Sequence, residues 1–264
     1  MELARILEPI FSHSFEGKIW NIVSESSGQH LLLEVRDQQN FFTSFYIYDH
    51  TDRSFNKKAI SFEEKWWIGI SHFTRDLIVF HTFPETDDPS VKEFFGYNVK
   101  QSRISWTKKS MDIVSFEMNS FNAITKGEMA VRQFDLASGA LMTGNPSSKT
   151  QEDTNHVQYP FHYAQGDDHF DTVREFLASL NVHHIERGVD YYEGHAVVVI
   201  SYYTGGTKLD NDLLVIDFNR SILLKECLGS ELSGISDRAF FIFHDTLIFV
   251  KDNTNFLSYQ LPSK

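Results

Sequence analysis

The sequence predicts an all-β protein built from repeated four-stranded antiparallel sheets, with one helical insertion. Strand-like runs recur along the chain, one hairpin pattern is repeated, and aromatic side chains are abundant. The 264 residues include 24 Phe, 10 Tyr and 4 Trp, and aromatic side chains fit a pleated sheet surface better than a helix. All-β folds of this length are often one domain, so we expect a single domain over residues 1–264.

Short runs of aromatic, aliphatic and β-branched residues recur through most of the chain, bounded by Gly, Asn, Asp or Ser. Runs of this kind with turn residues at both ends predict antiparallel strands joined by tight turns. The predicted strands are 29–35, 41–49, 66–72, 76–83, 93–99, 195–203, 212–218, 238–244 and 246–252.

One hairpin pattern recurs, in which a strand ends in Asp or Asn, a short polar turn follows and a second apolar strand begins. The anchor residues are Asp49, Asn98, Asp135 and Asp217. Successive anchors are 49, 37 and 82 residues apart, which indicates a unit of roughly forty residues, the size of a four-stranded repeat. Each short anchor side chain can accept a backbone N–H bond across its turn.

The segments Asn98–Trp106 (NVKQSRISW) and Phe134–Met142 (FDLASGALM) resemble β-propeller repeat proteins with quinoprotein-like blades. In such blades a strand ends in Asp, a turn containing Gly follows, and the outer strand ends in Trp. Only Gly139 supplies that glycine, since Arg or Ser stands at the equivalent places. The resemblance implies the architecture and not quinone chemistry. The chain also resembles an uncharacterised bacterial family of propeller-like structure, which supplies no functional residue.

We therefore expect a propeller-like ring of about five blades, or six if the insertion hides an irregular one. The last repeat has three predicted strands before Lys264. Phe15–Trp20 (FEGKIW) has the form of a missing outer strand, with Gly17 as its turn residue and Trp20 matching Trp106. Pairing this segment with the last repeat would close the ring and remove an exposed sheet edge.

The insertion, at about residues 144–184, breaks the strand pattern. A polar loop at 143–155 (TGNPSSKTQEDTN) is rich in residues that avoid regular structure. Asp171–His184 is the one predicted helix, in which Thr172 and Glu175 have the spacing of a capping box. Its apolar face comprises Val173, Phe176, Leu177 and Leu180. We expect that face to lie across the sheets or over one end of a central channel.

Charge and composition exclude several classes of partner. The 36 acidic and 24 basic residues give a net charge of −12, which opposes the approach of nucleic acid. No window offers about 18 consecutive apolar residues for a membrane span. The single cysteine, Cys227, and the absence of a signal-peptide pattern predict a cytoplasmic protein.

Motifs that bind nucleotides, dinucleotides or zinc, and motifs that position a nucleophile, are missing from the sequence, so we expect no cofactor. The glycine-rich stretch Tyr202–Asp212 predicts a hairpin loop. Cys227 is interpreted as a small packed hydrophobe. The aromatic pair in Lys65–Trp67 could stack on a ligand ring, but we favour packing in the core.

Histidines and acidic residues cluster on both sides of the predicted helix. The candidate metal ligands are His162, Asp167, His169, His183 and His195, because imidazole and carboxylate groups could bind a divalent metal if folding brought several together. The simpler interpretation is that Asp167–Asp171 complements the helix dipole at its N-terminus, while His183 and His184 do so at its C-terminus.

Two functions fit these observations. The first is a noncatalytic binding or scaffold protein that holds an unknown protein or small-molecule partner. The second is a hydrolase or lyase acting on a sugar or other small molecule, with acidic and His residues at the channel mouth. Convergence of His162, His169, His183 and His195 in one concave pocket would favour the enzyme, and their dispersal would favour the binding protein.

Overall fold

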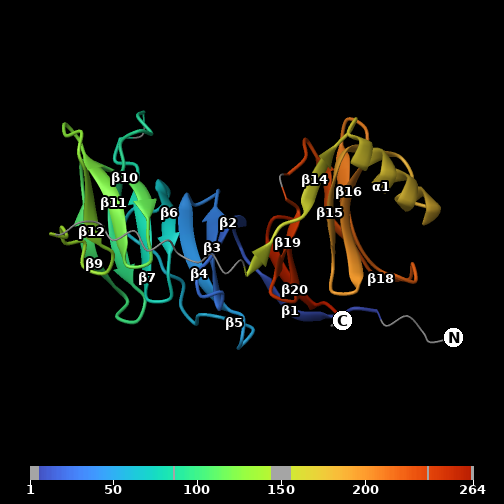
Figure 1. Cartoon of the computed structure of the whole chain (residues 1–264), viewed down its shortest axis with the longest axis horizontal. Helices are drawn as coiled ribbons and strands as arrows, with labels where there is room; N and C mark the ends of the chain where they lie inside the picture. Colours follow the sequence, from blue (N-terminus) through green and yellow to red (C-terminus); the bar gives the residue numbers. More distant parts are fainter. Residues whose placement is uncertain (1–5, 86, 144–155, 237, 263–264) are drawn as a thin grey trace. The chain divides into compact units, whose positions relative to one another are not determined.

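The computed structural model describes residues 6–85, 87–143, 156–236 and 238–262. These residues form five antiparallel sheets and one helix (Figure 1). This result confirms the prediction of an all-β, propeller-like fold with five blade-like sheets. The described part of the chain contains no helix with the length and apolar character needed to cross a membrane.

The chain divides into two compact units, each described by itself below. The first unit combines Met1–Ile19 with Asn155–Lys264, and the second is Trp20–Thr154. The expectation of a single domain over the whole chain stays a prediction.

Three sheets make up the second unit. The first sheet has the order β2 (Lys18–Ser24), β3 (His30–Asp37), β4 (Phe42–Asp49) and β5 (Ser54–Phe55). The next has the order β6 (Ile68–Phe73), β7 (Leu77–Thr82), β8 (Glu93–Asn98) and β9 (Arg103–Lys108). The third has the order β10 (Met111–Phe116), β11 (Ser120–Thr125) and β12 (Val131–Asp135).

Two sheets and the helix make up the first unit. One sheet has the order β14 (Phe161–Ala164), β15 (Ile185–Gly194), β16 (Val197–Gly205), β17 (Leu209–Asp217) and β18 (Ile222–Leu232). The other has the order β1 (Pro9–Ser14), β21 (Asn255–Gln260), β20 (Thr246–Lys251), β19 (Phe240–Phe243) and β13 (Val157–Gln158). The helix is α1 (Asp168–Ser179). All nine predicted strands are present, and Gly205 turns the predicted β16–β17 hairpin with a φ of 116°.

The inner strand β7 of sheet β6–β9 is buried on both faces, and the alternation of its side chains shows how. Leu77 and Val79 join a core shared with sheet β10–β12. Ile78 and Phe80 join a core shared with sheet β2–β5. Because successive side chains of a strand point to opposite faces, a continuous apolar run serves both cores.

Trp106 on β9 fastens sheet β6–β9 to sheet β10–β12. Its indole Nε1 donates a hydrogen bond to the Leu136 carbonyl oxygen at 2.8 Å, and its ring stacks on Phe121 with centroids 5.3 Å apart. A Cβ atom at Gly96 or Gly139 would lie within 2.8 Å of the indole. These two glycines therefore form the slot that admits the ring, which explains the glycine and tryptophan of the repeat pattern.

In the first unit, the two faces of β17 pack against different hydrophobic cores. Leu213 and Val215 belong to a core shared with β19, β20 and β21. Leu214 and Ile216 belong to a second core, which contains the apolar residues of α1. Figure 1 shows the helix lying along sheet β14–β18. The prediction that the helix packs across a sheet is therefore confirmed.

The four anchor residues of the hairpin pattern accept turn N–H groups as predicted. Asp49 Oδ1 accepts from Thr51 N at 2.8 Å, and Asn98 Oδ1 accepts from Gln101 N at 2.8 Å. Asp135 Oδ1 and Asp217 Oδ1 make the equivalent bonds at 2.8 and 2.7 Å. The repeat found in the sequence thus reflects one turn chemistry used in four hairpins.

The N-terminal strand does complete the last sheet, but the residues predicted to do so were wrong. β1, at Pro9–Ser14, pairs with β21, whereas Phe15–Trp20 leads into β2 of another sheet. Gly17 lies in the bend between β1 and β2, and Trp20 is 61% exposed while Trp106 is 7% exposed. The centroid of the Trp20 ring instead lies 5.1 Å from the Arg36 guanidinium carbon. Trp20 therefore does not have the buried packing role of Trp106.

The helix begins three residues before its predicted start and is capped differently. Asp167 is the N-cap residue, and it makes no side-chain bond to the helix N–H groups. Thr172 lies inside the first turns and donates to the Asp168 carbonyl oxygen at 3.2 Å, so the predicted capping box is wrong. Asp168 and Asp171 do occupy the first turn, where negative charge favours the helix dipole.

The predicted apolar face is largely confirmed. Val173 and Leu177 are buried, Phe176 and Leu180 are half-buried against the same core, and Phe170 joins them. The predicted polar loop at 143–155 lies, apart from Thr143, outside the described residues.

The indole slot predicts a large stability loss on truncation of Trp106. Trp106→Ala should lower the free energy of unfolding by about 3–5 kcal/mol, because it empties a buried slot and leaves the Leu136 carbonyl without its donor. Urea unfolding measures the change, with Trp67→Ala, at a 44% exposed position, as the control expected to lose about 1 kcal/mol or less. Equal losses for the two variants would contradict the role given to the slot.

Candidate functional site

His162, the first candidate metal ligand, is paired with a buried carboxylate. It lies opposite Asp190 in the β14–β15 pairing, and its Nδ1 is 2.8 Å from Asp190 Oδ1. Asp190 is 2% exposed, and its Oδ2 accepts the Ala239 N–H at 2.8 Å. This carboxylate therefore ties β14 to the start of β19, which is a structural role for the pair.

Asp167 and His169 lie at the start of α1. The His169 ring is 5.1 Å from the Tyr163 ring, and Asp167 Oδ2 accepts the Ala164 N–H at 2.9 Å. Tyr163 follows His162 on β14, so the two side chains point to opposite faces of the sheet. His169 consequently lies on the helix-covered face and His162 on the other.

His183 and His195 are separated by the length of a strand. His183 precedes β15 and His195 follows its last residue, and a strand of ten residues spans on the order of 30 Å. Within the described ranges, no group of three or more His, Cys, Asp or Glu side chains could hold a metal ion. The metal site stays a prediction without a supporting cluster in that part of the chain.

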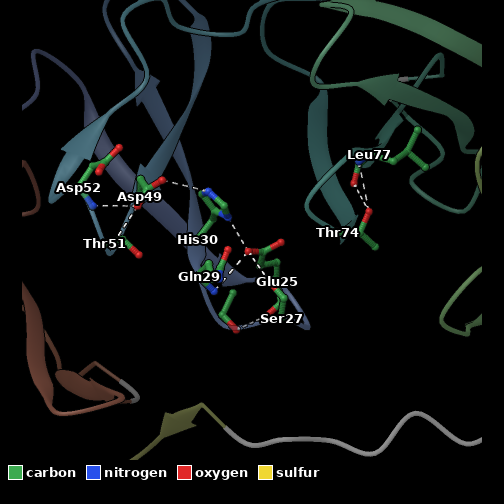
Figure 2. Close-up of polar contacts among 10 residues, drawn as sticks. Glu25, Ser27, Gln29, His30, Asp49, Thr51, Asp52, Thr74 and Leu77 are labelled. Atoms are coloured by element: carbon green, nitrogen blue, oxygen red, sulfur yellow. Dashed lines mark hydrogen bonds and ion pairs between the residues drawn. The ribbon is translucent and has the colours of Figure 1, made fainter.

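A carboxylate–imidazole–carboxylate network joins the β2–β3 turn to the end of β4 (Figure 2). His30 Nδ1 lies 2.5 Å from Glu25 Oε1, and His30 Nε2 lies 3.3 Å from Asp49 Oδ2. Glu25 Oε1 also accepts from Ser27 Oγ at 2.8 Å and Gln29 N at 3.3 Å. The Glu25 side chain has no exposed surface.

The network has a structural role because both ring nitrogens of His30 face carboxylates. With a carboxylate oxygen beside each ring nitrogen, neither nitrogen of His30 is open to a substrate. Among the described atoms Glu25 Oε2 is buried without a hydrogen-bond partner, so the network depends on Oε1 for its internal bonds. Asp49 thereby serves both its own turn and the turn of Glu25.

Two smaller sequence interpretations concern the aromatic pair Trp66–Trp67 and Cys227. Packing of the aromatic pair in the core is wrong, because Trp67 is exposed and Trp66 packs at the surface, 5.2 Å from the Arg36 guanidinium carbon. Cys227 is half-buried on β18, with its Sγ 3.4 Å from Ser230 Oγ.

His72 and His81 are the two histidines whose protonation is changed most by burial. Burial lowers the pKa of each imidazole to about 4. His72 stacks on Phe116 with ring centroids 4.4 Å apart, which places it between sheets β6–β9 and β10–β12. Both histidines are therefore neutral packing groups near pH 7.

An open cavity of about 320 Å³ lies in the first unit, and we take it as the candidate binding site. Its volume is at the lower end of the roughly 300–1,000 Å³ typical of ligand pockets. The cavity is lined by Asn211 of β17, by Leu228, Gly229 and Leu232 of β18, by Ser233–Ser236, by Ala239, and by Val250 and Asn253. The floor residues Asn211, Leu228 and Gly229 are buried, whereas Ser233–Ser236 are exposed.

The cavity forms where the core between the two sheets of the first unit becomes polar. Val197 and Val199 of β16 face this core, and by alternation Ser201 and Tyr203 continue the same face. Asn211 lies opposite Tyr203 in the strand pairing, and irregular pairing with β18 occurs on both sides of Asn211. Bulges of this kind re-aim side chains beside functional sites.

A chain of hydrogen bonds leads from the core to the cavity wall. Ser201 Oγ donates to Asn211 Oδ1 at 2.7 Å, and Asn211 Nδ2 donates to Tyr203 OH at 3.2 Å. The Ser236 N–H donates to the same Tyr203 oxygen at 2.9 Å. Tyr203 OH lies 3.0 Å from Ser236 Oγ.

The direction of the last bond follows from the capacity of the tyrosine oxygen. A phenolic oxygen accepts two hydrogen bonds and donates one. Because two N–H groups already occupy its acceptor sites, Tyr203 must donate its own hydrogen to Ser236 Oγ. The Ser236 hydroxyl hydrogen is then not used in the bond to Tyr203.

No local sequence pattern identifies Asn211, Tyr203, Ser236, Glu25 or His30 as site residues. The available signal was a polar residue at a core-facing position of an otherwise apolar strand, as at Ser201 and Asn211. The partner residues are separated by turns and by other strands, so the pairing depends on the fold.

Comparison with known families and curated proteins gives no function. A family described as "Domain of unknown function (DUF4905)" matches residues 24–106, which is less than half of the chain. This match agrees with the resemblance to an uncharacterised family. No curated protein matches the chain.

Solved structures similar to this chain include β-propeller domains. The β-propeller domain of Cps50 (Swd1) from Myceliophteria thermophila is 10% identical, with 90% of this chain and 64% of that chain covered and a TM-score of 0.31. TolB from Acinetobacter baumannii is 8% identical, with coverage of 94% and 56% and a TM-score of 0.30. The β-propeller domain of the Trilobed protease from Pyrococcus furiosus is 8% identical, with coverage of 93% and 82% and a TM-score of 0.35.

This chain spans less than two thirds of the length of the first two structures.

The lowered pKa values of His72 and His81 predict acid sensitivity. In the unfolded chain each imidazole binds a proton below its ordinary pKa of about 6.5, whereas in the folded chain it does so only near pH 4. The free energy of unfolding should therefore be highest above pH 6.5 and should fall as the pH is lowered toward 4. His72→Gln should reduce the stability difference between pH 7 and pH 4.5 by roughly 1–3 kcal/mol, as measured by urea unfolding. His183→Gln, at an exposed position, is the control, and an equal reduction there would contradict the assignment.

The buried network of Glu25 predicts strong energetic coupling. A double-mutant cycle with Glu25→Ala and His30→Ala should give a coupling energy of about 2 kcal/mol or more, because either single change leaves a buried group unpaired. The exposed pair Glu128 and Arg132, 2.9 Å apart, is the control, with expected coupling near 0.5 kcal/mol or less. Coupling as weak in the first pair as in the control would refute a buried network.

Proposed function

We propose that this chain is a noncatalytic binding protein that holds a small molecule in the cavity beside β17 and β18. The observation that carries this proposal is the cavity of about 320 Å³, whose polar wall ends in the Ser236 hydroxyl. Tyr203 holds Ser236 through two contacts, at 2.9 and 3.0 Å. A donor positioned in this way reduces the ordering cost of binding.

The chemistry of the cavity wall supports binding over catalysis. Hydrolases and lyases need a general acid or base within hydrogen-bond reach of the substrate. The described polar residues that line the cavity are Asn211, Ser233, Ser236 and Asn253, and neither an amide nor an unactivated hydroxyl serves as a base near pH 7. The positions of His162, His169, His183 and His195 also favour the binding protein by the criterion of dispersal.

A small-molecule partner accounts for the remaining composition. The net charge of −12 disfavours nucleic acid. We also propose a cytoplasmic location, which rests on Cys227 as the only cysteine.

Filling the cavity should abolish binding. Gly234 lines the cavity, and a Cβ atom added there meets nothing within 4 Å, so Gly234→Leu can project into the space without a backbone clash. Wild-type protein should show a ligand that raises Tm by roughly 5 °C at saturating concentration, in a screen of monosaccharides, amino acids, nucleosides and dicarboxylates. Gly234→Leu should lose that shift.

The matched control is Gly206→Leu, since Gly206 also meets nothing within 4 Å and lies in the β16–β17 turn. This variant should keep the full shift. A shift that survives in Gly234→Leu, or a screen in which no compound raises Tm, would contradict binding in this cavity.

A further inference from the structure

The polar groups around the cavity share one property, which is that each can both donate and accept hydrogen bonds. Ser233 and Ser236 contribute hydroxyls, and Asn211 and Asn253 contribute amides. The described lining residues include no Lys, Arg, His, Asp or Glu. Groups that donate and accept are best matched by ligand groups that do the same, and hydroxyls are of this kind.

The donors of the wall are set by the hydrogen-bond chain. With Tyr203 donating to Ser236 Oγ, the Ser236 hydroxyl keeps its own hydrogen and one lone pair for another partner. Asn211 lines the cavity and uses one of its two amide N–H groups on Tyr203, which leaves the second N–H for another acceptor. A ligand oxygen near these groups would meet two donors.

The other part of the lining is apolar. Leu228, Leu232 and Val250 line the cavity with aliphatic side chains, which suit the C–H faces of a saturated ring. A charged ligand group at the floor would lose hydration beside Asn211 and Leu228 without gaining an ion partner, which is costly.

From these features we infer that the cavity takes an uncharged polyhydroxyl compound, with a ring of sugar size, whose hydroxyl oxygen accepts from Ser236. This inference rests on the proposed function and names the class of ligand for the same site. The groups that both donate and accept bind the hydroxyls, the aliphatic groups cover the ring, and the described lining offers a charged ligand group no ion partner.

The test uses three probes of similar shape that differ in charge: glucose, glucuronate and glucosamine. Ligand-observed NMR titrations at pH 7 should show glucose binding to wild-type protein at least about tenfold more tightly than either charged probe. Ser236→Ala should weaken glucose binding about 5- to 10-fold, the loss expected for one hydrogen bond. Ser236→Thr keeps the hydroxyl and should bind within about twofold of wild type.

Ser230→Ala is the matched control, because Ser230 lies on β18, contacts Cys227 and does not line the cavity. It should leave glucose binding unchanged. Tighter binding of glucuronate or glucosamine, lost in Gly234→Leu, would overturn the ligand class while the binding function stands. Absence of glucose binding would also overturn the class, and the wider Tm screen then decides the binding function separately. Unchanged glucose binding in Ser236→Ala would overturn the contact assigned to that hydroxyl.

Discussion

Burial of both faces of an inner sheet is the constraint on which the rest of this structure depends. Sheets β6–β9 and β14–β18 have an apolar layer on each side. Their central strands therefore need apolar side chains on both faces, whereas most antiparallel sheets have one polar face in contact with water. β7 and β17 accordingly have continuous apolar runs. Aromatic side chains fill the space between layers, and the indole of Trp106 adds a directional bond to that filling.

The candidate site arises where this constraint is relaxed. On the face between the two sheets of the first unit, the series from Val197 to Tyr203 changes from aliphatic to hydroxyl-bearing side chains. Burying Ser201 and Asn211 would be unfavourable without partners, and each supplies the other with one. The bonds that satisfy these polar groups also orient the wall of the cavity, so under the proposed function the same contacts would serve stability and ligand recognition.

Local chemistry decided which features could be predicted from the sequence. The Asp49, Asn98, Asp135 and Asp217 turns were predictable because donor and acceptor lie within four residues. The helix was predictable from its periodicity, although it starts at Asp168, after the extended N-cap residue Asp167.

The features that could not be predicted from the sequence depend on pairing between distant segments of the chain. β15 was missed because its many charged residues hide its strand character, and β1 was misplaced because the sequence around Gly17 has the same features as a hairpin turn. The network of Glu25 and the cavity beside Asn211 depend on neighbours brought together by folding, which no local pattern encodes.

The helix on sheet β14–β18 has a consequence for how such a protein can grow. Repeat architectures lengthen by duplicating a unit that packs on the exposed apolar face of the last one, and terminal elements stop this process by covering that face. Phe170, Val173 and Leu177 cover this face, so a duplicated sheet would have to displace α1 before it could bind there. The helix therefore blocks the addition of a further repeat on its side of sheet β14–β18.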